Sequence, residues 1–140
     1  AAYCPDTATA VADCNLAVVE LTPAQYETAV VNLHLAERRH VGYTVTLRQD
    51  GRAVSAAAVT DCGTRYGQIS YVATLQEYEG QGLGRAMVYR CAEWLRERGR
   101  TPLIACEAHR ESFYAGLGFE QVSCVTIFGA EQPEERNEEA

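Results

Sequence analysis

Lysine is absent from this 140-residue sequence, in which all twelve basic residues are Arg. A protein without a side-chain ammonium has no group for Schiff-base chemistry or for a lysine proton shuttle, so both are excluded. The sequence also has no apolar run long enough to span a membrane. The first fourteen residues lack a positive region followed by an apolar one, so they do not predict a secretory signal. We therefore expect a cytoplasmic protein, in which thiols stay reduced.

Metal-binding patterns are missing as well. The six cysteines form no C-x-x-C pair, and the three histidines are scattered, so the sequence predicts no metal site. Cys91, Cys106 and Cys124 lie in apolar patterns, and we expect them to pack as small hydrophobic side chains. Cys4 and Cys14 would pair only in an oxidising compartment, which the sequence alone does not decide.

The net charge of −7 is unevenly distributed along the chain. Residues 131–140 hold five Glu and one Arg, and we expect them to form an acidic disordered tail. Residues 1–130 have the size of a single domain with one core. Its mildly acidic character argues against non-specific nucleic-acid binding, which needs a basic face, and suits cationic amine substrates. We expect neither nucleic acid nor membrane as a partner.

The apolar pattern predicts the element order β-α-β-β-β-α-β-α-β. The expected strands cover residues 15–21, 43–49, 53–59, 66–75, 102–106 and 119–128. Three helices are expected. The first begins at the capping box Thr22-Pro23-Ala24-Gln25, and the other two cover residues 85–98 and 111–117. Asp50-Gly51 predicts a hairpin turn. A helix that crosses between the strands at 66–75 and 102–106 makes these two parallel in an otherwise largely antiparallel sheet, so we predict a mixed α+β fold.

The most informative motif is Glu79-Gly80-Gln81-Gly82-Leu83-Gly84-Arg85, between an expected strand and an expected helix. Glycines let the backbone approach a ligand closely, and the following helix contributes the positive end of its dipole. Together these features predict an anion site that accepts a pyrophosphate without a side-chain cation. The spacing matches neither the phosphate loop of nucleotide hydrolases nor the dinucleotide fingerprint, so we do not expect nucleotide hydrolysis.

At this junction the chain resembles the Gcn5-related N-acetyltransferase (GNAT) family, whose signature is Gln/Arg-x-x-Gly-x-Gly/Ala. The resemblance extends to Tyr71-Val72-Ala73-Thr74-Leu75, which is similar to the family's fourth strand. It includes Ser112-Phe113-Tyr114-Ala115-Gly116-Leu117-Gly118-Phe119, which is similar to a later Phe-Tyr-x-x-x-Gly-Phe segment. The resemblance is specific over residues 69–120.

The resemblance implies a GNAT-like acyltransferase fold, in which helices flank a sheet with a splayed parallel strand pair. It implies an N-acetyltransferase that moves an acetyl group from acetyl-CoA to a primary amine of a small molecule or protein, by direct attack in a ternary complex. The implied pantetheine contacts are Val72, Ala73 and Thr74. The implied pyrophosphate contacts are Glu79, Gly80, Gln81, Gly82, Leu83, Gly84 and Arg85. Tyr114 is implied as the acid that protonates the departing thiolate.

Several points stay open from the sequence. Glu107 and His109 are candidates for the general base, which would take the amine proton directly or through water, but a solvated surface position is the more common role for such residues. Glu79 replaces the usual Gln or Arg and should repel phosphates unless it faces solvent or pairs with Arg85. An alternative function is therefore a catalytically lapsed acyl-CoA sensor or interaction module.

The region that binds the acceptor carries no recognisable motif. We expect the first helix and the loops at residues 38–43 and 106–110 to shape this pocket, without identifying the amine. The C-terminal strand pair looks short, which favours completion of the sheet by a partner subunit in a homodimer.

Overall fold

The structure, a computed structural model, describes residues 6–130. It divides into two compact units, of which the first ends at Cys106 and the second begins at Glu107. Cys4 and the acidic tail expected at residues 131–140 lie outside the described residues. A single domain over residues 1–130 stays a prediction.

The first element is a helix, α1 (Thr7–Val18), and the strand predicted over residues 15–21 is wrong. The Asp6 carboxylate caps α1 by accepting a hydrogen bond from the Thr9 backbone N–H at 2.8 Å. Most of the middle of the helix is buried, so it lacks the one-sided apolar period by which sequence analysis recognises a helix. The apolar run Leu16-Ala17-Val18-Val19 at its end, which contains two β-branched valines, therefore resembled a strand.

The second helix, α2 (Pro23–Arg38), begins where the capping box predicts. The Thr22 hydroxyl accepts from the Gln25 backbone N–H at 3.2 Å, and the Gln25 side chain accepts from the Thr22 N–H at 2.9 Å. The helix buries Ala29, Leu33 and Ala36 on one face.

Four strands form one sheet in the order β1-β2-β3-β4. They are β1 (Tyr43–Gln49), β2 (Arg52–Cys62), β3 (Tyr66–Thr74) and β4 (Thr101–Ile104). The Asp50-Gly51 turn joins β1 to β2, as predicted. The pairs β1–β2 and β2–β3 are antiparallel, while β3–β4 is parallel. The structure thus confirms the mixed α+β fold and its parallel strand pair.

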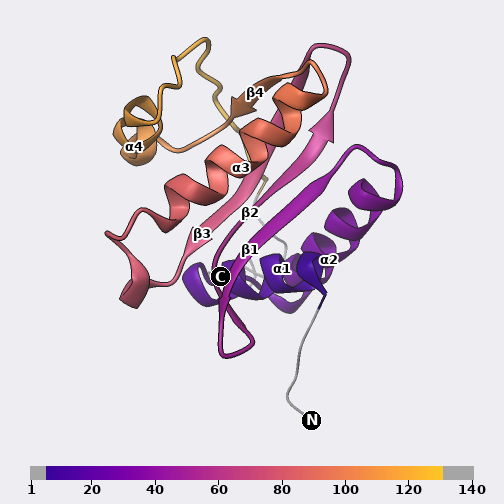
Figure 1. Cartoon of the computed structure of the whole chain (residues 1–140), viewed down its shortest axis with the longest axis vertical. Coiled ribbons are helices and arrows are strands. Elements are labelled where there is room, and N and C mark those ends of the chain that lie inside the picture. Colours follow the sequence, from indigo (N-terminus) through magenta and orange to yellow (C-terminus); the bar gives the residue numbers. More distant parts are fainter. Residues whose placement is uncertain (1–5, 131–140) are drawn as a thin grey trace. The chain divides into compact units, whose positions relative to one another are not determined.

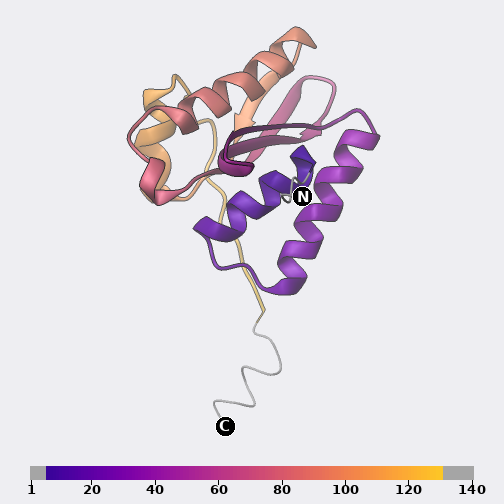
Figure 2. The ribbon, with the colours of Figure 1, turned by 60° about the horizontal axis from the view of Figure 1, so that its bottom comes forward.

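Helices cover both faces of this sheet (Figures 1 and 2). The helices α1 and α2 pack on one face, and α3 (Leu83–Glu97) packs on the other. Because β2 lies between these layers, its residues 53–59 are buried without alternation. On the α3 side, the ring of Trp94 stacks on that of Tyr43 with centroids 5.6 Å apart, which ties α3 to β1.

The described part of the second unit contains a short 3-10 turn, Ala108–Arg110, and the helix α4 (Glu111–Gly116). The strand predicted over residues 119–128 is wrong, because the described structure has no regular element there. Val122, Val125, Ile127 and Phe128 in this segment are exposed. Their β propensity is strong, but a strand also needs a neighbouring strand with which to form a ladder.

A glycine marks the close approach of α3 to β3. A Cβ atom at Gly67 would lie 2.1 Å from Cδ2 of Leu95, whose side chain is fully buried. We predict that Gly67→Ala lowers the free energy of unfolding by about 1–3 kcal/mol through overpacking, as measured by urea denaturation.

The matched control is Gly63→Ala, because a Cβ atom at Gly63 would meet nothing closer than the Tyr66 carbonyl oxygen at 3.5 Å. Equal stability of the two variants would contradict the close packing of α3 on β3.

Candidate functional site

The strand β3 is longer than its parallel neighbour. The ladder between them pairs residues 66–69 with residues 101–104, whereas β3 continues to Thr74. Within the described first unit, residues 70–74 therefore have no strand beside them on the edge that faces away from β2. Unpaired backbone groups on such an edge can bind an extended ligand as an added strand. The predicted pantetheine contacts Val72, Ala73 and Thr74 all lie on this edge.

A β-bulge lies within the free segment of β3. Ser70 pairs with Ala58 and Ala73 with Ala56, so Tyr71 and Val72 together face the single residue between those two on β2. Tyr71 has a left-handed backbone, with φ of 55°. Bulges bend a strand and change the direction of its side chains, and they occur frequently beside functional sites.

The helix α1 holds this bulge in place. The side-chain amide of Asn15 donates to the Tyr71 carbonyl oxygen at 3.0 Å and to the Val11 carbonyl oxygen at 2.9 Å. Sequence analysis missed both Asn15 and Tyr71 as determinants of the site. Ser70-Tyr71-Val72 has the composition of an ordinary strand, and no local signal in it marks the extra residue.

The glycine loop enters α3 directly. Gly80 and Gly82 have φ of 80° and 79°, a conformation that favours glycine, and Gly82 is the N-cap of α3. No side chain caps this helix end, so its first N–H groups are free of the usual intramolecular partner. A Cβ atom at Gly80 or Gly82 would have nothing within 4 Å, so the loop borders open space. The loop thus has the glycine conformations and the uncapped helix start that the predicted anion cradle needs, while the binding of a pyrophosphate there stays a prediction.

Glu79 and Arg85, the two charged residues of this loop, form no ion pair with each other within residues 6–130. Glu79 is exposed, and the Arg85 guanidinium carbon lies 5.1 Å from the centroid of the Tyr89 ring. Of the two arrangements left open by the sequence, the structure has Glu79 facing solvent.

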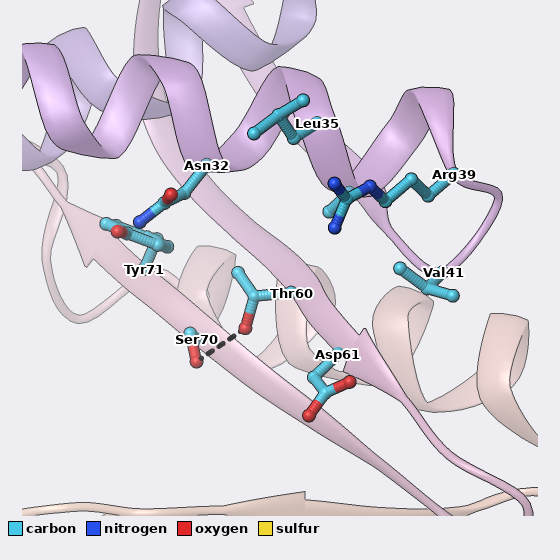
Figure 3. Close-up of a pocket in the computed structure, with 9 residues that line it drawn as sticks. Asn32, Leu35, Arg39, Val41, Thr60, Asp61, Ser70 and Tyr71 are labelled. Carbon is cyan, nitrogen blue, oxygen red and sulfur yellow. Dashed lines mark hydrogen bonds between the residues drawn. The ribbon is translucent and has the colours of Figure 1, made fainter.

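A pocket of about 570 Å³ opens on the face of the sheet that α2 covers (Figure 3). The helix α2 and the segment after it contribute Asn32, Leu35, Ala36, Arg39 and Val41, and the strands contribute Thr60, Asp61, Ser70 and Tyr71. Arg39 and Val41 belong to the loop that sequence analysis expected to shape an acceptor pocket. A second pocket, of about 380 Å³, lies beside Gln25 and also includes Tyr71. The bulged residue thus borders both pockets.

The other predicted site residues belong to the second unit. Glu107 Oε2 lies 3.3 Å from His109 Nδ1, so the two base candidates are neighbours, and both are exposed. Tyr114 is buried and packs edge-on against Phe113 and Phe119, with centroid distances of 5.0 and 6.1 Å. The catalytic roles of these residues stay predictions.

The cysteines differ from expectation in part. Cys91 is buried as predicted, and burial raises its pKa to about 12, but Cys106 and Cys124 are exposed. Burial likewise raises the pKa of Cys14 to about 11. Among the described residues, no cluster of three His, Cys, Asp or Glu side chains is arranged to hold a metal ion. Nor does any helix within residues 6–130 have the length and apolar character needed to cross a bilayer.

Comparison with known families gives one match over most of the chain. The model of the Acetyltransferase (GNAT) family matches residues 11–119. This range includes the free edge of β3, the glycine loop and Tyr114. No curated protein matches the chain at a significant level.

Solved structures are similar at low sequence identity. An acetyltransferase from Trypanosoma brucei has a TM-score of 0.71 at 21% identity, with 89% of this chain and 93% of that chain covered. Glucosamine-6-phosphate N-acetyltransferase from Arabidopsis thaliana has a TM-score of 0.67 at 14% identity, with 86% and 88% covered. A predicted acetyltransferase from Clostridium acetobutylicum, solved with acetyl-CoA, has a TM-score of 0.70 at 12% identity, with 86% of each chain covered. At sequence identities this low, the structural similarity establishes a common fold and nothing more.

The hydrogen bond from Asn15 to the bulge generates a prediction. Asn15→Ala leaves the Tyr71 carbonyl oxygen without this donor, and we expect a loss of about 1 kcal/mol in the free energy of unfolding. Asn32→Ala is the control, because Asn32 is an exposed residue of α2 at which alanine should only improve helix propensity. If both variants are equally stable in urea denaturation, Asn15 does not hold the bulge.

Proposed function

The chain belongs to the Acetyltransferase (GNAT) family, and from this premise we propose that it transfers an acetyl group from acetyl-CoA to a primary amine. The observation that carries the proposal is the free edge of β3 at residues 70–74, followed directly by the glycine loop at the start of α3. An extended pantetheine chain suits the first feature and a pyrophosphate suits the second.

The residues that would bind acetyl-CoA follow from this arrangement. The backbone of Val72, Ala73 and Thr74 would pair with pantetheine, and an N–H group of this segment would polarise the thioester carbonyl. Residues 79–85 would hold the pyrophosphate through their backbone, since open space borders the glycines.

In the proposed reaction the amine nitrogen attacks the thioester carbon directly, in a complex of both substrates. A C–N bond forms, the C–S bond breaks, and the electron pair of that bond leaves with sulfur. The amine loses one proton, for which Glu107 and His109 are the proposed acceptors, and the thiolate gains one, for which we propose Tyr114. No covalent enzyme intermediate is required.

A second candidate function is an acyl-CoA sensor or interaction module without catalysis. The exposed carboxylate of Glu79, at a position where the family signature has Gln or Arg, favours it. Release of free thiol from acetyl-CoA in the presence of amines separates the two functions, because a sensor binds the cofactor and releases no thiol.

The cofactor site can be tested at a glycine. Gly82→Val places a branched side chain in the cradle, and we predict that coenzyme A then no longer raises the Tm of the protein. Gly99→Val is the control, because Gly99 also has a positive φ, of 71°, with nothing within 4 Å of its Cβ position. Both variants bear similar backbone strain, so a loss of coenzyme A stabilisation in Gly82→Val alone supports the cradle. Full stabilisation of Gly82→Val would show that the loop is not the site.

The role of Tyr114 is tested by removing its hydroxyl group. Because a phenol titrates near ~10 and a thiol near ~8.5, a tyrosine stabilises a developing thiolate by hydrogen bonding more readily than by full proton transfer. We predict that Tyr114→Phe lowers kcat and kcat/KM together by roughly 100-fold, with cofactor affinity unchanged. Tyr66→Phe removes an exposed tyrosine hydroxyl from β3 and should keep full activity. A normal kcat for Tyr114→Phe would leave Tyr114 as a packing residue.

A further inference from the structure

Two β-bulges give the pocket beside α2 its polar lining. Successive residues of a regular strand point to opposite faces of a sheet. Yet Thr60 and Asp61 are consecutive and line the same pocket, as do Ser70 and Tyr71. Each pair lies at a bulge, since Thr60 is an extra residue of β2 and Tyr71 belongs to the bulge of β3. The bulges thus bring side chains from adjacent positions onto one face, where the Thr60 hydroxyl donates to that of Ser70 at 3.1 Å.

The pocket carries two charges of opposite sign, on Arg39 and Asp61. Among the residues that the structure describes, neither the Arg39 guanidinium nor the Asp61 carboxylate makes an ion pair or a side-chain hydrogen bond. Figure 3 shows both at the end of the pocket where Val41 lies. A ligand that bears an anion and a cation close together would satisfy both groups.

The opposite end of the pocket is uncharged and leads to the free edge of β3. Asn32 and Tyr71 face each other there (Figure 3), and Tyr71 directly precedes Val72. Asp61 pairs with Gln68 on β3, and Gln68 lies three residues before Tyr71. The distance along the strand from Asp61 to Tyr71 is therefore about 10 Å. On the other wall, Arg39 comes seven positions after Asn32, which again corresponds to about 10 Å along a helix.

We propose that this pocket binds the acceptor, and that the acceptor is an α-amino acid with a second primary amine at the end of an extended side chain. Asp61 binds the α-ammonium, Arg39 binds the α-carboxylate, and the side-chain amine reaches past Tyr71 to the thioester. In an extended lysine the five bonds from Cα to the terminal nitrogen span about 6 Å. Contact distances of about 3 Å at each end extend this to about 12 Å, slightly more than the pocket, so the terminal amine reaches just past Tyr71. The inference rests on the proposed function.

The experiment compares amines in a thiol-release assay with acetyl-CoA. L-lysine and L-ornithine carry the full head group, whereas cadaverine lacks the carboxylate and ε-aminocaproate lacks the α-ammonium. We expect kcat/KM for the better diamino acid to exceed that for either truncated amine by about 10-fold or more. L-norleucine, which lacks the reacting amine, should bind in calorimetry and compete with L-lysine.

Two variants assign the head-group contacts. Arg39→Gln should raise KM for L-lysine by about 10-fold and leave that for cadaverine unchanged, because cadaverine has no carboxylate. Asp61→Asn should raise KM for L-lysine and leave that for ε-aminocaproate unchanged. Arg38→Gln, at the neighbouring position, and Asp50→Asn, in the β1–β2 turn, are the controls, because they remove like charges from residues that do not line the pocket. Urea denaturation confirms that all four variants are folded.

The outcomes separate this inference from the function on which it rests. Two outcomes overturn the inference and leave the proposed function standing. One is thiol release without preference for amines that carry the full head group, and the other is turnover of glucosamine-6-phosphate but of no diamino acid. If Arg39→Gln lowers kcat/KM by the same factor for every amine, Arg39 has a structural role, and this outcome also overturns the inference. Failure of every amine to release thiol contradicts the proposed function. In that case calorimetry tests the head-group site separately, because a failure of L-norleucine to bind overturns the assignment of Arg39 and Asp61 as its contacts.

Discussion

The local departure of two strands from regular alternation shapes both the free edge of β3 and the pocket beside α2, where we propose that acetyl transfer takes place. The bulge at Tyr71 and Val72 lies just beyond the last pair of the β3–β4 ladder, so β3 bends where its edge becomes free. Asn15 links this bend to α1. A left-handed Tyr costs of order 1 kcal/mol, which the hydrogen bond from Asn15 offsets in part. The bend of the free edge, the pocket lining and the position of Tyr71 all follow from this geometry.

Small side chains in β2 and α1 let the helices pack closely on the sheet. In β2, residues 56–58 are three consecutive alanines, all fully buried, and α1 presents further alanines to the same core. Gly67 has the same function for α3 on the opposite face, where Leu95 occupies the space that a Cβ atom would fill. Close packing of this kind tolerates few larger residues. The central strand therefore has little freedom to shift, which keeps the bulge of β3 in register.

The sequence predicted those features that have local signals. The capping box at Thr22, the Asp50-Gly51 turn and the glycines before α3 each specify backbone geometry within a few residues, and each was confirmed. Features that depend on distant partners were wrong or missed. The helix α1 is buried on most sides, so its pattern has no amphipathic period, and residues 119–128 have strand propensity without a ladder. The bulge at Tyr71 depends on Asn15, 56 residues away. Completion of the sheet by a partner subunit stays a prediction.

The exposed carboxylate of Glu79 is compatible with an anion cradle in its immediate vicinity. Two unit charges 4 Å apart in water repel each other by only about 1 kcal/mol, and salt screens this further. A charge-assisted hydrogen bond from one backbone N–H contributes about 1.5–3 kcal/mol, and the uncapped first turn of α3 offers several such donors. Attraction therefore exceeds repulsion as long as Glu79 faces solvent. The loss of the usual Gln or Arg at this position lowers the expected affinity for the cofactor without removing the physical basis for its binding. The observation that favours a sensor is therefore compatible with an enzyme as well.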